Sequence, residues 1–456
     1  MSATDDHLAE NATDSESSGS PGGPARGLAF ALLRAVLRRG RTLEQALLTA
    51  TPAGAEEGAS AAARLDPRDR AFARLMASTT LRRLGQIDAL IDHCLDHPLP
   101  RRAAGVHDLL RLGTCQLVFL GTPPHAAVDR MVELAASIGH ARFKGLVNAV
   151  LRRLAREGAA LAEAQDAARL NTPDWLWRSW CRAYGDAVCD AIAASHLEQA
   201  PLDITVRRDA AVWAEMLHAA LLPTGSLRRA PGGAVERLPG YEEGAWWVQD
   251  AAAALPARLL DVPAGAPVLD LCAAPGGKTA QLAAAGARVT AVDRSAKRLK
   301  RLEANLARLD LTAELIVADV ALWLPPMPVS HVLLDAPCTG TGTIRRHPDI
   351  ARVKGAADVV RLSRTQDRLL AAAVDMTAPG GVLVYTTCSL QPEEGPARIA
   401  ALLAQGAPVA RDPVRPEELP DLAQAITPEG AVRTLPCHWP AQGGLDGFYA
   451  ARLRRL

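Results

Sequence analysis

Apolar side chains recur at helical spacing through the first part of the chain. Between Ala25 and Arg39 they fall on every third or fourth position, and Gly40 follows as a stop signal. No strand-like alternation of any length interrupts this pattern, which recurs over residues 71–84, 87–95, 106–120, 126–138 and 144–156. The pattern predicts an all-helical domain over residues 25–160.

A mixed pattern occupies residues 170–245. Thr172, Pro173 and Asp174 are typical of an N-cap, a first-turn proline and a first-turn acid, so they predict the start of a helix. Residues 202–207 then resemble a strand and residues 213–222 a helix. We interpret the segment as a small α+β module that binds RNA.

Short apolar runs alternate with helical segments after Pro267. The runs lie at residues 268–271, 289–293, 315–317, 331–335 and 382–385, and the helical segments at residues 278–285, 295–309, 357–378 and 393–405. Alternating β and α elements favour a doubly wound, mostly parallel sheet that binds ligands at the carboxyl ends of its strands. We predict an α/β Rossmann-like domain over residues 246–456.

The composition of the chain predicts a disordered N-terminal tail and a cytoplasmic location. Residues 1–24 are rich in Ser, Gly, Asp and Glu, which predicts a disordered tail. The net charge of +1 excludes a globally basic protein but leaves room for local basic surfaces that bind nucleic acid. The eight cysteines form no C-x-x-C pair, and the chain has no signal peptide and no apolar run that could span a bilayer. We therefore expect a cytoplasmic monomer without disulfides, metal site or membrane contact.

A glycine turn and three acids indicate a nucleoside cofactor. In Asp270-Leu-Cys-Ala-Ala-Pro-Gly-Gly-Lys-Thr279 an apolar strand leads into Gly276 and Gly277, which allow close approach of a ligand. Asp293 ends the next strand, where an acid suits ribose hydroxyls, and Asp319 follows a third strand, where it could meet an adenine amino group. A structural turn is the plain alternative. A phosphate-binding P-loop is excluded because Cys272 stands where its first glycine belongs.

Two cysteines close later strands on the same side of the predicted sheet. Cys338 lies in Asp335-Ala-Pro-Cys-Thr-Gly-Thr-Gly342 and Cys388 in Tyr385-Thr-Thr-Cys-Ser-Leu390. A thiolate that adds to C6 of cytosine makes C5 nucleophilic enough to take a methyl group. Asp335 is placed to hold the N3–N4 edge of the base. Cys272 belongs to the cofactor turn, where we expect contact through the backbone and no chemistry. The other cysteines are interpreted as small buried apolar side chains, namely Cys94, Cys115, Cys181, Cys189 and Cys437.

Basic residues follow the Pro-Cys segment directly. Arg345, Arg346 and His347 are predicted to contact phosphates beside the target base. Arginine and lysine clusters elsewhere, such as the one over residues 294–301, are at least as compatible with a solvated helix face. Because a base inside a helix is out of reach, the target must be single-stranded or flipped out.

These motifs resemble a known family. The segments DLCAAPGGKT, AVDRS, DAPCTGTG and YTTCSL resemble, in order and spacing, the bacterial 16S rRNA cytosine-5 methyltransferases of the RsmB (Sun, Fmu) type. The helical region is similar to the NusB-like domain of that group, notably over residues 66–70 and 145–152. The resemblance implies S-adenosylmethionine as cofactor and 16S rRNA as substrate. It leaves open whether the helical domain binds protein, RNA or both.

The resemblance also implies residue roles. Cys388 would be the nucleophile and Cys338 would assist release of the methylated product. A departure from the family is Val320, where relatives often have a small residue. Two alternatives remain: a non-catalytic RNA-binding factor built around the NusB-like domain, and a DNA cytosine-5 methyltransferase. The implied cofactor contacts are Cys272, Ala273, Ala274, Pro275, Gly276, Gly277, Lys278, Asp293, Asp319 and Asp335.

Overall fold

The computed structural model describes residues 23–49 and 65–456 of the chain. Most of the predicted tail, residues 1–22, lies outside the described residues. Gly23 and Pro24 belong to the first helix, so that helix begins before the predicted position at Ala25. In the described ranges no helix combines the length and apolarity needed to cross a membrane.

The N-terminal part is helical, as predicted. Its α-helices are α1 (Gly23–Arg39), α2 (Leu43–Thr49), α3 (Pro67–Arg82), α4 (Leu84–His93), α5 (Ala104–Thr114), α6 (Pro124–Ser137) and α7 (Lys144–Glu163). A π-helical turn over Cys115–Phe119 extends α5. The sequence pattern missed α2, because this short helix buries only Leu43 and Ala46 and so shows no apolar period.

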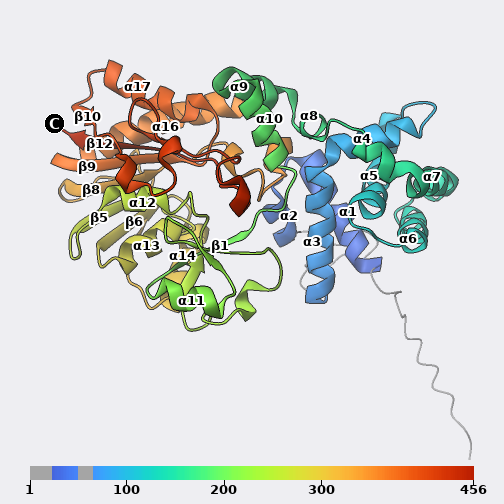
Figure 1. Cartoon of the computed structure of the whole chain (residues 1–456), viewed down its shortest axis with the longest axis horizontal. Coiled ribbons are helices and arrows are strands. Elements are labelled where there is room, and N and C mark those ends of the chain that lie inside the picture. The colour runs from blue at the N-terminus through green and yellow to red at the C-terminus, as the bar shows by residue number, and fades with distance from the viewer. Residues whose placement is uncertain (1–22, 50–64) are drawn as a thin grey trace, which may run out of the picture.

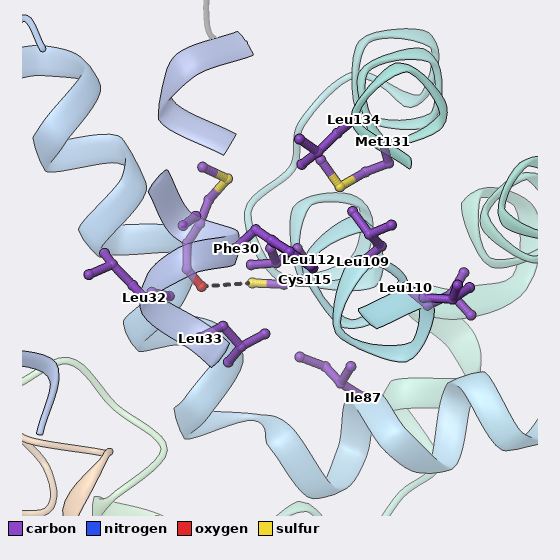
Figure 2. Packing of buried hydrophobic residues seen from close by; sticks show 14 of the residues in the cluster. Phe30, Leu32, Leu33, Ile87, Leu109, Leu110, Leu112, Cys115, Met131 and Leu134 are labelled. Carbon is purple, nitrogen blue, oxygen red and sulfur yellow. Dashed lines mark hydrogen bonds between the residues drawn. The ribbon is translucent and has the colours of Figure 1, made fainter. Parts of the chain in front are cut away.

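One apolar core holds these helices together (Figure 2). Phe30 and Leu33 from α1 meet Leu109 and Leu112 from α5 in it, all at most 2% exposed. Cys115 lies in the same core, where its thiol donates to the carbonyl of Met76 at 3.8 Å. Burial raises the pKa of Cys115 to about 12, so this thiol stays protonated and inert.

A connecting region leads from the helical bundle to the large sheet (Figure 1). It contains α8 (Ala167–Asn171), α9 (Asp174–Tyr184) and α10 (Asp186–Ser195), followed by an antiparallel sheet in the order β2-β3-β1-β4. Its strands and helix are β1 (Leu202–Val206), α11 (Ala210–Met216), β2 (Ala220–Leu221), β3 (Leu227–Arg229) and β4 (Trp246–Val248).

Three predictions for this region need correction. Thr172 does not cap α9, because its hydroxyl donates back to the carbonyl of Ala168 at 2.9 Å and Pro173 takes the N-cap position. The helix predicted to reach residue 222 ends at Met216, and Ala220 already belongs to a strand. The small sheet extends beyond residue 245, because β4 pairs with β1.

The C-terminal part forms the predicted doubly wound domain. Its main sheet has the order β10-β12-β9-β8-β5-β6-β7, in which β9 through β7 run parallel, and β12 pairs antiparallel with β9, β10 and the short strand β11. The strands are β5 (Pro267–Leu271), β6 (Arg288–Asp293), β7 (Glu314–Val317), β8 (Val329–Asp335), β9 (Thr377–Thr387), β10 (Val409–Arg411), β11 (Val432–Arg433) and β12 (Tyr449–Arg455). The helices are α12 (Leu255–Leu260), α13 (Gly277–Ala284), α14 (Ala296–Arg308), α15 (Ile350–Val353), α16 (Ala356–Met376) and α17 (Pro396–Ala404).

Helices cover both faces of this sheet. Val268 points into a core with residues of α12, α13 and α14, whereas its neighbour Leu269 points into a second core with residues of α16 and α17. Successive side chains of a strand lie on opposite faces, which explains the two cores and the continuous apolar runs in the sequence.

The helical domain contacts the segment that follows the Pro-Cys motif. Arg82 of α3 donates to the carbonyl of Arg345 at 2.8 Å, and the amide of Leu43 donates to the carboxylate of Asp349 at 3.0 Å. Val353 of α15 packs against the helical core itself. The helical domain and the C-terminal domain therefore share a packed junction within seven to fifteen residues of Cys338 in the sequence.

Candidate active site

The site lies where the order of the parallel strands reverses. From β5 the chain continues outward through β6 and β7, and then returns to place β8 on the other side of β5. Ligands of doubly wound sheets bind at such a switch point, beyond the carboxyl ends of the strands. The segments after β5, β6, β8 and β9 carry the motifs singled out in the sequence.

The turn after β5 is held close to its neighbours. Gly276 has φ +105°, and a Cβ atom there would stand 2.6 Å from Cγ of Leu302 in α14. The carboxylate of Asp293 accepts from the amide of Ala274 at 3.2 Å and from that of Ser295 at 2.8 Å. These bonds fix the second predicted acid against the glycine turn.

A pocket opens beside this turn. It is lined by three predicted cofactor residues, Cys272, Asp293 and Asp319. Val320, the departure noted in the sequence, also lines it and packs into the core at 3% exposure. The remaining lining residues were not among the predicted cofactor contacts; they are Arg294, Arg298, Ala318, Pro337, Thr365, Arg368 and Leu369. The sequence did not indicate a ligand contact for Thr365, Arg368 and Leu369, because these residues belong to α16, an ordinary amphipathic helix.

Lys278 points toward the other side of the turn. Its ammonium lies 2.7 Å from the carboxylate of Asp335 and 5.2 Å from the ring centre of Phe448. Burial lowers the pKa of Lys278, but Asp335 and the nearby thiol of Cys388 raise it more, so the net pKa is raised. Lys278 is therefore a permanent cation next to both groups.

The two cysteines meet in space. The sulfur atoms of Cys338 and Cys388 lie 3.4 Å apart, although 50 residues separate them in the sequence. Both side chains are half-buried. The contact with Cys388, together with burial, raises the pKa of Cys338 well above its ordinary value. The site thus holds one thiol that keeps its proton and one that lies near a lysine.

Comparison with known proteins places this geometry in a family. A family model described as 16S rRNA methyltransferase RsmB/F matches residues 257–454, and the NusB family model matches residues 23–156. The ribosomal RNA small subunit methyltransferase B of Pseudomonas putida is 38% identical over 412 residues, which cover 86% of this chain and 92% of that protein. The chain belongs to the RsmB/F family of 16S rRNA methyltransferases.

A second relative and a solved structure each match nearly the whole chain. The protein of the same name from Vibrio cholerae is 34% identical and covers 94% of this chain and 97% of its own. The crystal structure of PH0851 superposes with a TM-score of 0.73 at 21% identity, over 96% of this chain and 99% of that one. The latter likeness supports the fold, from the helical domain through the last strand.

The cofactor of this RsmB/F chain is S-adenosylmethionine. The pocket fits that molecule, because it is bounded by the buried Asp293 at the end of β6 and by the exposed Asp319 after β7. Asp293 could hold ribose hydroxyls and Asp319 could reach an adenine edge. Cys272 lines the pocket as well, and burial raises the pKa of its thiol, so this side chain stays protonated.

Arg345 and Arg346 do not have the predicted role in this RsmB/F chain. Arg345 is 2% exposed and donates to Asp446 at 2.8 Å, and Arg346 donates to Asp250 at 2.6 Å and to Asp446 at 3.1 Å. Arg345 is buried, Arg346 is half-buried, and both guanidinium groups are already paired with acids, so the expectation of phosphate contact is corrected. His347 is exposed, and RNA contact there stays a prediction.

Asp270 gives the RsmB/F chain a pH-dependent stability. Burial raises its pKa to about 7, although the Thr279 hydroxyl donates to it at 2.6 Å. A raised carboxyl pKa means that the folded state binds the proton more tightly than the unfolded state. The contribution of Asp270 to the free energy of unfolding is therefore fully present below about pH 4, and it is lost as the pH rises through about 7.

We expect Asp270→Asn to remove this dependence. The melting temperature of the variant should exceed that of the wild type increasingly between pH 5 and pH 8, because the amide carries no charge to bury. Glu303→Gln on the exposed face of α14 is the matched control and should follow the wild type. Parallel wild-type and Asp270→Asn curves over this range would contradict the assignment.

Proposed function

We propose that the chain transfers a methyl group from S-adenosylmethionine to C5 of a cytosine in 16S rRNA, through a covalent bond between C6 and the sulfur of Cys388. The observation that carries the proposal is the pair of sulfur atoms, 3.4 Å apart, at the switch point of the sheet beside Asp335 and Lys278. One thiol can add to C6, and a second thiol beside it can assist the elimination that follows.

The proposed reaction is an addition to C6, a methyl transfer to C5 and an elimination. The thiolate of Cys388 adds to C6 and the electron pair of the C5–C6 double bond becomes available at C5. The bound S-adenosylmethionine supplies an electrophilic methyl group for that carbon. Loss of the C5 proton to a base then returns the electron pair to the C5–C6 bond, and the thiolate of Cys388 leaves. Cys338, in contact with the departing sulfur, assists this release.

The charges around the site support the assignment. The ammonium of Lys278 places a permanent positive charge near Cys388, and its ion pair with Asp335 at 2.7 Å holds that charge in the site. The side chain of Asp335 is 32% exposed, so its carboxylate can reach the N3–N4 edge of a base that enters the site. Lys278 also limits the freedom of Asp335, which keeps this hydrogen-bond acceptor in place.

The form of the RNA target and the assembly of the enzyme belong to the same proposal. Both sulfurs are half-buried, so the target cytosine must be single-stranded or flipped out to reach them. Cofactor pocket and both cysteines come from one chain, which allows the enzyme to act as a monomer. Because its proposed substrate is ribosomal RNA, we place the reaction in the cytoplasm.

A trapped intermediate tests the proposal. Cys338→Ala, incubated with 16S rRNA and S-adenosylmethionine, is expected to accumulate a protein–RNA adduct that survives denaturation. Mass spectrometry of the digested adduct should find the nucleotide on the peptide that contains Cys388. A stable adduct on Cys338 in a Cys388→Ala variant would reverse the two roles. Methylation of duplex DNA in preference to rRNA would replace the substrate.

A further inference from the structure

A buried glutamate lies behind the two cysteines. Glu394 is 0% exposed, and its carboxylate accepts from the amide of Thr339 at 2.9 Å and from its hydroxyl at 2.5 Å. It also accepts from the hydroxyl of Ser389 at 2.6 Å and from the amide nitrogen of Gln366 at 3.2 Å. These neutral donors satisfy a charge that would otherwise be expensive to bury.

Two of these donors, Thr339 and Ser389, are the sequence neighbours of the two cysteines. Thr339 directly follows Cys338, and Ser389 directly follows Cys388. One carboxylate therefore ties together the two loops that carry the sulfur atoms, and the two hydroxyls also lie 3.3 Å from each other. The separation of the sulfurs depends on this shared anchor.

The anchor is itself rigid. The carbonyl of Glu394 accepts from the hydroxyl of Tyr385 at 2.8 Å and from that of Thr387 at 3.1 Å, and both donors belong to β9. Since β9 leads directly into Cys388, the carboxylate is fixed to the strand that places this cysteine. The Thr339 loop is then fixed to the same strand through the carboxylate.

The charge of Glu394 also distinguishes the two thiols. It adds to the contact with Cys388 and to burial in raising the pKa of Cys338. Lys278, in contrast, is a cation near Cys388. The anion of Glu394 thus favours the protonated form of Cys338, and the two thiols have different electrostatic surroundings.

We propose that Glu394 is a positioning residue that sets the geometry of the two cysteines and keeps their roles apart. The inference rests on the proposed function, since it assumes that both thiols take part. It assigns a task to a residue that touches neither cofactor nor substrate.

Glu394→Gln tests the inference, with Glu393→Gln as the matched control. Glu393 is the exposed neighbour, so its variant should keep the wild-type rate. In Glu394→Gln one acceptor oxygen becomes a donor that faces other donors, and the loops shift. We expect kcat to fall by about 100-fold, the loss typical of a 1 Å misplacement, while KM for RNA and Kd for S-adenosylmethionine change little.

Adduct formation gives a readout that general loss of stability would not move. In the Cys338→Ala background, Glu394→Gln should slow the appearance of the adduct, because the carboxylate also places Cys388 through Ser389. If Glu394→Gln folds poorly, Ser389→Ala and Thr339→Val each remove one tie and should lower kcat by smaller factors.

Two outcomes separate the inference from the function on which it rests. A wild-type kcat in Glu394→Gln, or unchanged rates in both Ser389→Ala and Thr339→Val, together with an inactive Cys388→Ser, would overturn the inference alone. An active Cys388→Ser would overturn the proposed function, whatever Glu394→Gln does.

Discussion

Replacing Cys388 by serine is expected to lower methyl transfer by roughly 10⁴-fold or more, as removal of a covalent nucleophile does in other enzymes. A serine hydroxyl keeps the size of the side chain but is a far weaker acid than a thiol, so the nearby Lys278 cannot make it an anion. Without addition at C6, C5 of cytosine stays too poor a nucleophile to take the methyl group.

The binding of cofactor separates this chemical effect from unfolding. Cys388 does not line the pocket described for S-adenosylmethionine, so calorimetry of Cys388→Ser should give a wild-type Kd. Cys94→Ser is the control for a half-buried thiol far from the site in the helical domain, and it should keep full activity. Methyl transfer by Cys388→Ser within tenfold of the wild type would rule out Cys388 as nucleophile.

Much of this site follows from strand ends that the sequence marks clearly. Parallel strands are buried on both faces, so β5, β6, β8 and β9 appear as continuous apolar runs, and their carboxyl ends must lie at one edge. Cys338 and Cys388 each follow such a run, which is why their meeting at 3.4 Å was predictable from 50 residues apart. The same logic placed Asp293 and Asp319 at one pocket.

What the sequence could not show depends on partners distant in the chain. Arg345 resembles a phosphate ligand because it follows the Pro-Cys loop, but its partner Asp446 lies 101 residues away. Glu394 carries no local sign either, since Thr339 is 55 residues upstream. Periodicity reports which face of an element is buried, and it cannot report which polar groups meet inside. Short helices such as α2 cannot be predicted from the sequence for a related reason, because two buried apolar positions define no period.

Arg345 and Arg346 form part of a largely buried network of three arginines and three acids. Its cations are Arg228, Arg345 and Arg346, and its acids are Asp203, Asp250 and Asp446. The network joins the small sheet, through Asp203 and Arg228, to the segment after the Pro-Cys loop and to the segment before β12. A charge removed from one side leaves an uncompensated charge in a site that water does not reach.

Arg345→Met is therefore expected to lower the free energy of unfolding by about 3–5 kcal/mol, the usual effect of breaking a buried ion pair from one side. Methionine preserves the volume of the aliphatic stem, so the loss is electrostatic and not a cavity. Arg345→Met with Asp446→Asn restores the balance of charge and should recover much of the loss, since the remaining acids keep their arginines. Denaturant unfolding curves of the two variants and of Arg294→Met, an exposed control, measure the difference. Equal destabilisation in the single and double variants would mean that shape, and not charge, holds this junction.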